Sequence, residues 1–227
     1  THKVVLNGTS KQTVNFYSPG YSDFNILELK NYSEEGVYFK SRLQVADFIT
    51  NNCKIVFSTI GTMTWNLSED REFESITISN ATINLNGHDL IINGDLKLSS
   101  GKINLNGQRL IVNGNFMHTK GIMNIDGGEL IVSGNYSLGT SGSDSYATLK
   151  MVNESDYVQV AGNFLTQSKI DHTGLLTAGL MEIGGDFSQL YIYNGSGNYT
   201  GTHNNFRTSG THKVVLNGTS KQTVNFY

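Results

Sequence analysis

The chain contains few of the residues that mark several common classes of protein. Among its 227 residues are 1 Cys, 1 Pro and 1 Trp, and charged residues make up 15%. A lone cysteine cannot form an internal disulfide, so a small disulfide-stabilised scaffold is excluded. Cys53 lies in the stretch NNCKIVF, with Lys54 as its neighbouring cation. We expect a small buried side chain there rather than a reactive thiol.

The shortage of charge and of long apolar runs excludes further classes. The net charge is −3, whereas surfaces that bind nucleic acid or anionic membranes need clustered cations. The apolar runs are far shorter than a membrane span. No long segment has an apolar period of about 3.6 residues, and Asn, Ser, Thr and Gly take the place of strong helix formers. We therefore expect an all-β fold with no nucleic-acid partner and no membrane span.

What the chain does contain is a repeat of 20 residues between positions 83 and 138. Its rows read INLNGHDLIINGDLKLSSGK, INLNGQRLIVNGNFMHTKGI and MNIDGGELIVSGNYSL. Apolar residues alternate within each row, as in a strand with one buried face. Equivalent positions form columns: Leu90, Leu110 and Leu130; Ile92, Val112 and Val132; Gly94, Gly114 and Gly134; Asp95, Asn115 and Asn135. We expect the two branched apolar columns to be buried and the last column to form a ladder of stacked side-chain amides.

Two folds compete for these rows. In a meander, each Asn-Gly pair, such as Asn86-Gly87 or Asn93-Gly94, reverses the chain as a hairpin turn. In a β-solenoid, each pair is a corner and each row is one coil, since both residue types tolerate positive φ. Coils stacked about 4.8 Å apart explain why residue types recur in register, and hairpins do not. The favoured prediction is a single-stranded parallel β-helix with coils of about 20 residues.

The same pattern continues with insertions outside the three rows. The strand-turn-strand corner LIVNGNF returns as VQVAGNF at 158–164 and MEIGGDF at 181–187, so the extra residues are expected in loops such as 139–146. Further strands are expected at 24–29, 43–49 and 54–60. The most charged stretch, TMTWNLSEDREFES at 62–75, is expected to be an irregular loop.

A second kind of repeat joins the two ends of the chain. Residues 1–17 and 211–227 both read THKVVLNGTSKQTVNFY, at an offset of 210. This duplication predicts a tandem array in which 1–210 is one unit and 211–227 starts the next identical unit. A deliberately added copy is the alternative explanation. We expect end-to-end stacking of units through the alternating apolar residues of both copies: Val4, Leu6, Val14, Phe16, Val214, Leu216, Val224 and Phe226.

The rows resemble the β-helix repeats of large bacterial surface proteins, such as adhesins of the filamentous-haemagglutinin type. The long unit with its HKVVLNGTSKQTVNF element also resembles the tandem repeats of giant bacterial exoproteins. The resemblance implies an extracellular or cell-surface location, which agrees with the near-absence of cysteine. It is specific for fold and weak for function, because adhesins, fibres and polysaccharide-cleaving enzymes share coil patterns.

Residues for catalysis or metal binding are sparse. Asp89, Arg109 and Glu129 share one column and are expected to form a solvated, non-catalytic ladder of mixed charge. The histidines lack the HxH or HExxH spacing of a zinc site. Asp186 in GGDF belongs to the corner motif. We therefore assign no catalytic, cofactor-binding or metal-binding residue.

Aromatic residues near the end of the unit provide the best candidate for binding sugars. Tyr191, Tyr193 and Tyr199 lie with Phe206 in a stretch rich in Asn and Gly. A packed coil junction is the competing interpretation of this cluster. Three functions follow in order of preference: a structural repeat of an extracellular fibre or rod whose partners are other copies of itself, an adhesin stalk or carbohydrate-binding module, and a polysaccharide-active enzyme, which lacks a site.

Overall fold

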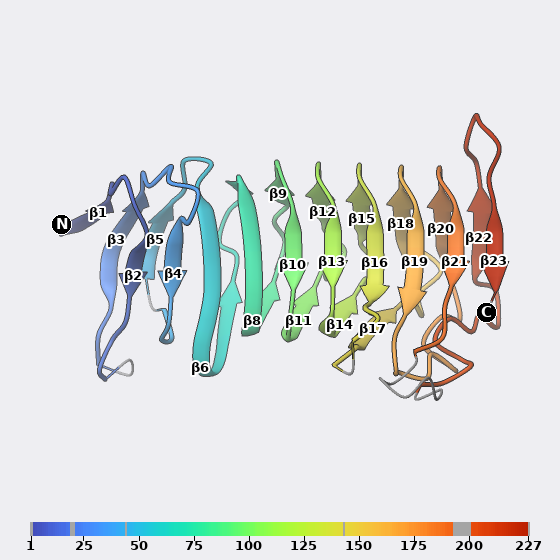
Figure 1. Ribbon diagram of the computed structural model, residues 1–227. Coiled ribbons are helices and arrows are strands. Elements are labelled where there is room, and N and C mark those ends of the chain that lie inside the picture. Colours follow the sequence, from blue (N-terminus) through green and yellow to red (C-terminus); the bar gives the residue numbers. More distant parts are fainter. Residues whose placement is uncertain (1, 19–20, 44, 143, 193–200, 227) are drawn as a thin grey trace.

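The computed structural model describes residues 2–18, 21–43, 45–142, 144–192 and 201–226, and it shows an all-β solenoid (Figure 1). Parallel strands stack in a row along an elongated rod, with the described ends of the chain at its opposite ends. Each strand pair in the described ranges is parallel and joins successive coils. The solenoid prediction is therefore confirmed, and the meander of hairpins is wrong.

Each regular coil contributes strands to three sheet surfaces. The longest ladder, the first face, contains β2 (Gln12–Val14), β4 (Val37–Phe39), β6 (Lys54–Asn66), β8 (Ser75–Asn84), β10 (Leu96–Leu98), β13 (Phe116–His118), β16 (Tyr136–Gly139), β19 (Phe164–Gln167), β21 (Phe187–Gln189) and β23 (Val224–Phe226). The long strands β6 and β8 turn onto the second face, which continues as β11 (Gly101–Asn104), β14 (Lys120–Asn124) and β17 (Tyr146–Lys150).

The third set of strands precedes the first face within each coil. It begins as a three-stranded sheet of β1 (Lys3–Leu6), β3 (Phe24–Leu29) and β5 (Val45–Ile49). It resumes as a seven-stranded sheet of β7 (Arg71–Phe73), β9 (Leu90–Ile92), β12 (Arg109–Val112), β15 (Glu129–Val132), β18 (Tyr157–Val160), β20 (Leu180–Ile183) and β22 (Lys213–Leu216). The three-stranded and the seven-stranded sheet therefore occupy the same position within the coil.

The apolar columns predicted from the rows are buried and in register. Leu110 pairs with Leu90 of the preceding coil and with Leu130 of the following coil, and all three are at most 1% exposed. The column continues through residues separated by inserted loops: Val158, Met181 and Val214. Like side chains sit on like because strands of successive coils stack at the fixed spacing of a sheet.

Aromatic rings stack along the interior of the C-terminal half. The ring centroids of Phe116 and Tyr136 are 4.6 Å apart, those of Tyr136 and Phe164 are 5.3 Å apart, and Phe187 follows at 5.7 Å. Phe226 in the last coil lies 5.6 Å from Phe187 and ends the described series. Each coil therefore covers the ring of the coil before it.

The corner at Asn86-Gly87 and the corner at Asn113-Gly114 differ in backbone conformation. This corrects the expectation that positive φ explains both kinds of Asn-Gly corner. Asn86 and Gly87 have φ of 54° and 94°, the left-handed conformation that these residues tolerate. Gly114 lacks a positive φ, but a Cβ built on it would lie 2.6 Å from the carbonyl oxygen of Gly94. The second kind of corner needs glycine because neighbouring coils approach closely there.

The charged stretch at 62–75 is more regular than expected. Its first part belongs to β6, its middle contains β7, and the expected loop is reduced to the residues between them. The burial pattern of β7 alternates, with Arg71 and Phe73 buried and Glu72 exposed. The sequence did not predict this strand because it contains charged residues. Arg71 is nevertheless buried, since its side chain pairs with Glu69.

Candidate functional site

The first copy of the duplicated segment forms the coil at the N-terminal end of the rod. β1 pairs with β3, and β2 pairs with β4, both in parallel register. Between the two strands, the Gly8 N–H donates to Oε1 of Gln12 at 2.7 Å and closes the turn. No strand of the described ranges pairs with the opposite edge of β1 or β2. This coil therefore has one paired edge and one open edge.

The second copy repeats this coil at the other end. β22 pairs with β20, and β23 pairs with β21. The Gly218 N–H donates to Oε1 of Gln222 at 2.9 Å, the same turn bond as in the first copy. The paired edge now faces the preceding coil instead of the following one. The first strand spans equivalent residues in both copies, whereas β2 lies two positions earlier in its copy than β23 does in the other. The same sequence is thus covered on opposite sides.

The two copies use different backbone groups for these contacts. In the first copy, the His2, Leu6 and Val14 carbonyls accept from the following coil, and the Gln12 and Phe16 N–H groups donate to it. In the second copy, the groups bonded to the preceding coil belong to Thr211, Lys213, Asn217 and Thr223. These are the equivalents of positions 1, 3, 7 and 13, so the two sets share no position. A strand directs successive peptide groups to alternate sides, and the copies therefore show complementary halves of one coil.

One side chain shows the same complementarity. Oε1 of Gln12 accepts from Nδ2 of Asn31 at 3.0 Å, on the side of the following coil. Nε2 of Gln222, the equivalent residue, donates to the Ile183 carbonyl at 2.9 Å, on the side of the preceding coil. A coil placed between two neighbours can make both contacts with one glutamine.

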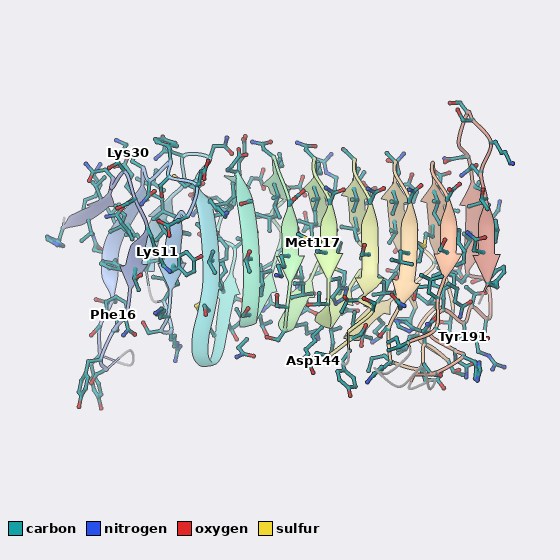
Figure 2. The ribbon with its side chains drawn as sticks, in the orientation of Figure 1. Lys11, Phe16, Lys30, Met117, Asp144 and Tyr191 are labelled. Atoms are coloured by element: carbon teal, nitrogen blue, oxygen red, sulfur yellow. The ribbon has the colours of Figure 1, made fainter. Side chains whose placement is uncertain are left out.

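A buried carboxylate lies against the first copy. Glu28 on β3 accepts from Nζ of Lys3 and of Lys30, both at 2.8 Å, and its side chain is 9% exposed. The hydrogen bond from Lys3, followed by that from Lys30, lowers the pKa of Glu28 to about 2. Lys213, the equivalent of Lys3 in the second copy, is exposed, and no ion pair of it is seen in the described ranges. Figure 2 shows Lys11, Phe16 and Lys30 together at the N-terminal end of the rod.

The C-terminal coil leaves apolar side chains uncovered. Val14 in the first copy is 8% exposed, whereas its equivalent Val224 is 45% exposed and Phe226 is 69% exposed. An open hollow of about 330 Å³ is lined here by Phe187, Phe206, Thr208, Val214, Leu216, Val224 and Phe226. In the first copy, Val4, Leu6 and Phe16 pack against the core, whereas in the second copy only Val214 of the equivalent residues does so. The residues expected to stack thus differ between the ends, because only the first copy has a coil over this face.

The column of mixed charge forms a surface ladder. Arg109 donates to Asp89 through Nε and Nη2 at 2.9 and 2.6 Å, and the hydrogen bond to Asp89 raises the pKa of Arg109. The Arg109 side chain is 55% exposed and Glu129 is exposed, as predicted. Asp89 is only 20% exposed, which corrects the expectation for this residue, because it also accepts from the Arg109 backbone N–H at 2.9 Å.

The column of Asp95, Asn115 and Asn135 forms the predicted ladder, with a different principal donor. The backbone N–H of Asn115 donates to Asp95 at 2.7 Å, and that of Asn135 donates to Asn115 at 2.9 Å. The expected bonds from the side-chain amides are longer, at 3.2 and 3.3 Å. The ladder continues through Asn163 and Asp186 to Thr223 in the second copy. It therefore connects the regular rows to the C-terminal coil.

A second asparagine ladder was missed by the sequence reasoning. Asn84 donates to Asn66 at 2.7 Å, Asn104 to Asn84 at 2.6 Å, and Asn124 to Asn104 at 3.3 Å. The recurrence of Asn as the second residue of each INLN or MNID motif was the available signal. Both ladders bind successive coils to one another through their polar corners.

The proposed sugar-binding cluster is only partly within the described residues. Tyr193 and Tyr199 lie outside them. The Tyr191 ring packs edge-on against His203 at 5.1 Å, and its carbonyl accepts from Gln167. The Phe206 ring packs against the rings of both Phe164 and Phe187, at 5.5 and 5.1 Å. The described part is a packed coil junction.

The side chains of Cys53 and His118 are buried. Cys53 is 1% exposed, and burial raises the pKa of its thiol, as expected of an inert residue. His118 is enclosed and contacts the Tyr136 hydroxyl at 3.2 Å, and burial lowers its pKa to about 3. The described ranges contain no cluster of three or more His, Cys, Asp or Glu residues arranged to hold a metal ion. No helix with the length and apolar character of a membrane span occurs in them.

Comparisons with family models, curated proteins and solved structures find no match to this chain. The resemblance to filamentous-haemagglutinin-type repeats therefore stays a prediction. Function is inferred here from the geometry of the two copies.

Proposed function

We propose that this chain is a structural repeat of a long rod or fibre, located outside the cell or at its surface, whose units join end to end. One observation carries the proposal: the duplicated coil is bonded on one side in its first copy and on the other side in its second. The unit is therefore suited to continue into an identical unit, with the coil at the joint hydrogen-bonded on both sides. The location rests on the resemblance to surface proteins alone.

The mechanical consequence concerns the joint between units. In an array, the coil 211–227 lies between β20 and β21 on one side and the next unit's equivalents of β3 and β4 on the other. The hydrogen-bonded ladders then run through the joint as they run through the unit. Because the shared coil itself forms the joint, force applied along the array passes through continuous parallel sheets.

A chain of two units tests this proposal. Residues 1–227 followed by a second copy of 18–227 restore the period of 210. Small-angle scattering and electron microscopy should show one straight rod of about twice the length of the single unit. Phe226→Asp places charge in the apolar joint and is the test variant. Thr219→Asp places the same charge in the exposed turn and is its matched control. The proposal fails if the unmodified chain consists of two rods at variable angles.

Glycan binding is the second candidate, at a position other than the one predicted. An open groove of about 710 Å³ is lined by Tyr32, Ser33, Glu34, Asn52, Lys54, Glu74 and Ser75. Tyr32 is 68% exposed, and an aromatic ring beside amide, carboxylate and ammonium groups matches the mixed apolar and polar faces of a sugar. Tyr146, 46% exposed on β17, supplies the matched control. A glycan array should lose its signal with Tyr32→Ala and keep it with Tyr146→Ala; no signal for the unmodified chain rejects this candidate.

A further inference from the structure

Building on the end-to-end joint proposed above, we propose that separate molecules of this chain join by coil exchange. Residues 211–227 of one molecule take the place of residues 1–17 in the next molecule. The surface involved is the open edge of β22 and β23, and its partner is the β3–β4 edge of a second copy of the same chain.

The first copy shows what fits on the open edge. There, β3 covers β1 and β4 covers β2, and the Phe24 ring lies 5.2 Å from Phe16. Each residue that makes these contacts has an identical equivalent in the second copy. The groups that face the following coil in the first copy are not used by the second copy for its bonds to β20 and β21. The C-terminal coil can therefore receive β3 and β4 without giving up its existing contacts.

Exchange leaves the number of paired strand edges and of covered apolar faces unchanged. Before exchange, each copy is paired along one edge; after exchange, one coil is paired along both. Val224 and Phe226, 45% and 69% exposed in the single chain, become covered, while the displaced Val14 and Phe16 lose their cover. The displaced residues 1–17 regain conformational freedom, which offsets part of the entropy lost on association. Replacement of an element by an identical one is the principle of domain swapping.

Charge distinguishes exchange from direct stacking of the two end coils. Direct stacking in register places Lys213 on Lys3 and Lys221 on Lys11, and like charges opposite one another are unfavourable. Exchange instead brings Lys213 to Glu28, the partner of Lys3 at 2.8 Å. It also brings Lys221 to the face of Tyr38, where Nζ of Lys11 lies 3.8 Å from the ring centroid. Each cation of the second copy then obtains the partner that its equivalent already has.

Exchange between molecules is heterologous and therefore open-ended. Each molecule has its donor coil at one end of the rod and its acceptor edge at the other (Figure 1). A head-to-tail contact that does not close into a ring extends into a filament.

Charge reversal in the full chain tests the exchange by sedimentation velocity and electron microscopy. Lys213→Glu places an acidic group opposite Glu28 and should lower the association constant about tenfold. Lys3→Glu weakens the resident coil and should raise association. Both side chains are exposed and point outward, so the fold is preserved in each variant. Direct stacking gives another pattern, because either reversal then places opposite charges together and strengthens association.

A reversible lock provides the second test. Lys3 and Ile26 are register partners on adjacent strands, whose spacing of about 4.8 Å permits a disulfide. The chain carrying Lys3→Cys and Ile26→Cys, with Cys53→Ala to remove the third thiol, should assemble when reduced and stay monomeric when oxidised. Equal assembly in both states overturns exchange, and so does an unmodified chain that stays monomeric at high concentration. Those results leave the rod of the covalent two-unit chain unaffected, so the two proposals fail separately.

Discussion

Gly114→Ala tests whether close approach of coils, rather than backbone conformation, requires glycine at the second corner. A Cβ at position 114 would lie 2.6 Å from both the carbon and the oxygen of the Gly94 carbonyl, and 2.5 Å from Oδ1 of Asp95. Ordinary van der Waals contact begins near 3.4 Å. The neighbouring coil contacts the added methyl through its backbone, so relief requires separation of the two coils.

The energetic cost follows from what that separation disturbs. The Gly114 N–H donates to the Gly94 carbonyl at 3.0 Å, and the Gly134 N–H donates to Gly114 at 2.9 Å. Weakening these bonds costs about 1 kcal/mol each, and overpacking adds about 1–3 kcal/mol. We expect Gly114→Ala to lower the free energy of unfolding by about 3–5 kcal/mol.

Gly107→Ala is the matched control for this measurement. Gly107 has φ of 80°, and an added Cβ would meet nothing within 4 Å. Its cost is the strain of the left-handed conformation, about 1–2 kcal/mol. Urea unfolding, followed by circular dichroism and the fluorescence of Trp65, compares the two variants. The reasoning is refuted if Gly114→Ala costs no more than Gly107→Ala.

Three further predictions concern the core, the surface ladder and pH. Leu110→Ala, at a fully buried position, should lower the free energy of unfolding by about 2–5 kcal/mol; a smaller loss in urea titrations contradicts the inward column. Arg109→Ala should change it by no more than about 1 kcal/mol, since the pair with Asp89 is exposed on the arginine side; a larger loss assigns this ladder a structural role. Burial lowers the pKa of His118 to about 3 and that of His172 to about 4. Unfolded imidazoles bind protons from about pH 6.5 downward and the folded ones do not, so stability should be full above pH 6.5. It should fall by up to about 1.4 kcal/mol per pH unit for each histidine as the pH drops towards 4. A urea midpoint that is constant between pH 6.5 and 4.5 contradicts this.

The regular coils were predictable because stacking repeats the same environment every turn. Leu110 pairs with a leucine in the preceding coil and a leucine in the following coil. The residues of one row therefore indicate the neighbours of the equivalent residues in the next row. The prediction failed where that regularity ends. The strand β7 escaped notice because Arg71 is buried and paired to Glu69, an arrangement that local hydrophobicity does not reveal.

The candidate site was only half predictable for the same reason. Its residues were identified from the duplication alone, and their alternation indicated which side chains face inward. Sequence identity cannot distinguish the two copies, since they have the same residues. The difference between Val14 and Val224 arises from the neighbouring coil, which covers one and not the other.

The sequence by itself determined the solenoid, its inward columns and the ladder of Asp95, Asn115 and Asn135. These properties follow from residue types that recur at a fixed spacing, which is local information. Only the tertiary structure decided which edge of the duplicated coil is bonded, why Gly94 and Gly114 must be glycine, and where Lys3 finds Glu28. Each of these depends on which peptide groups and side chains the preceding or following coil places within about 3 Å, the range over which hydrogen bonds act.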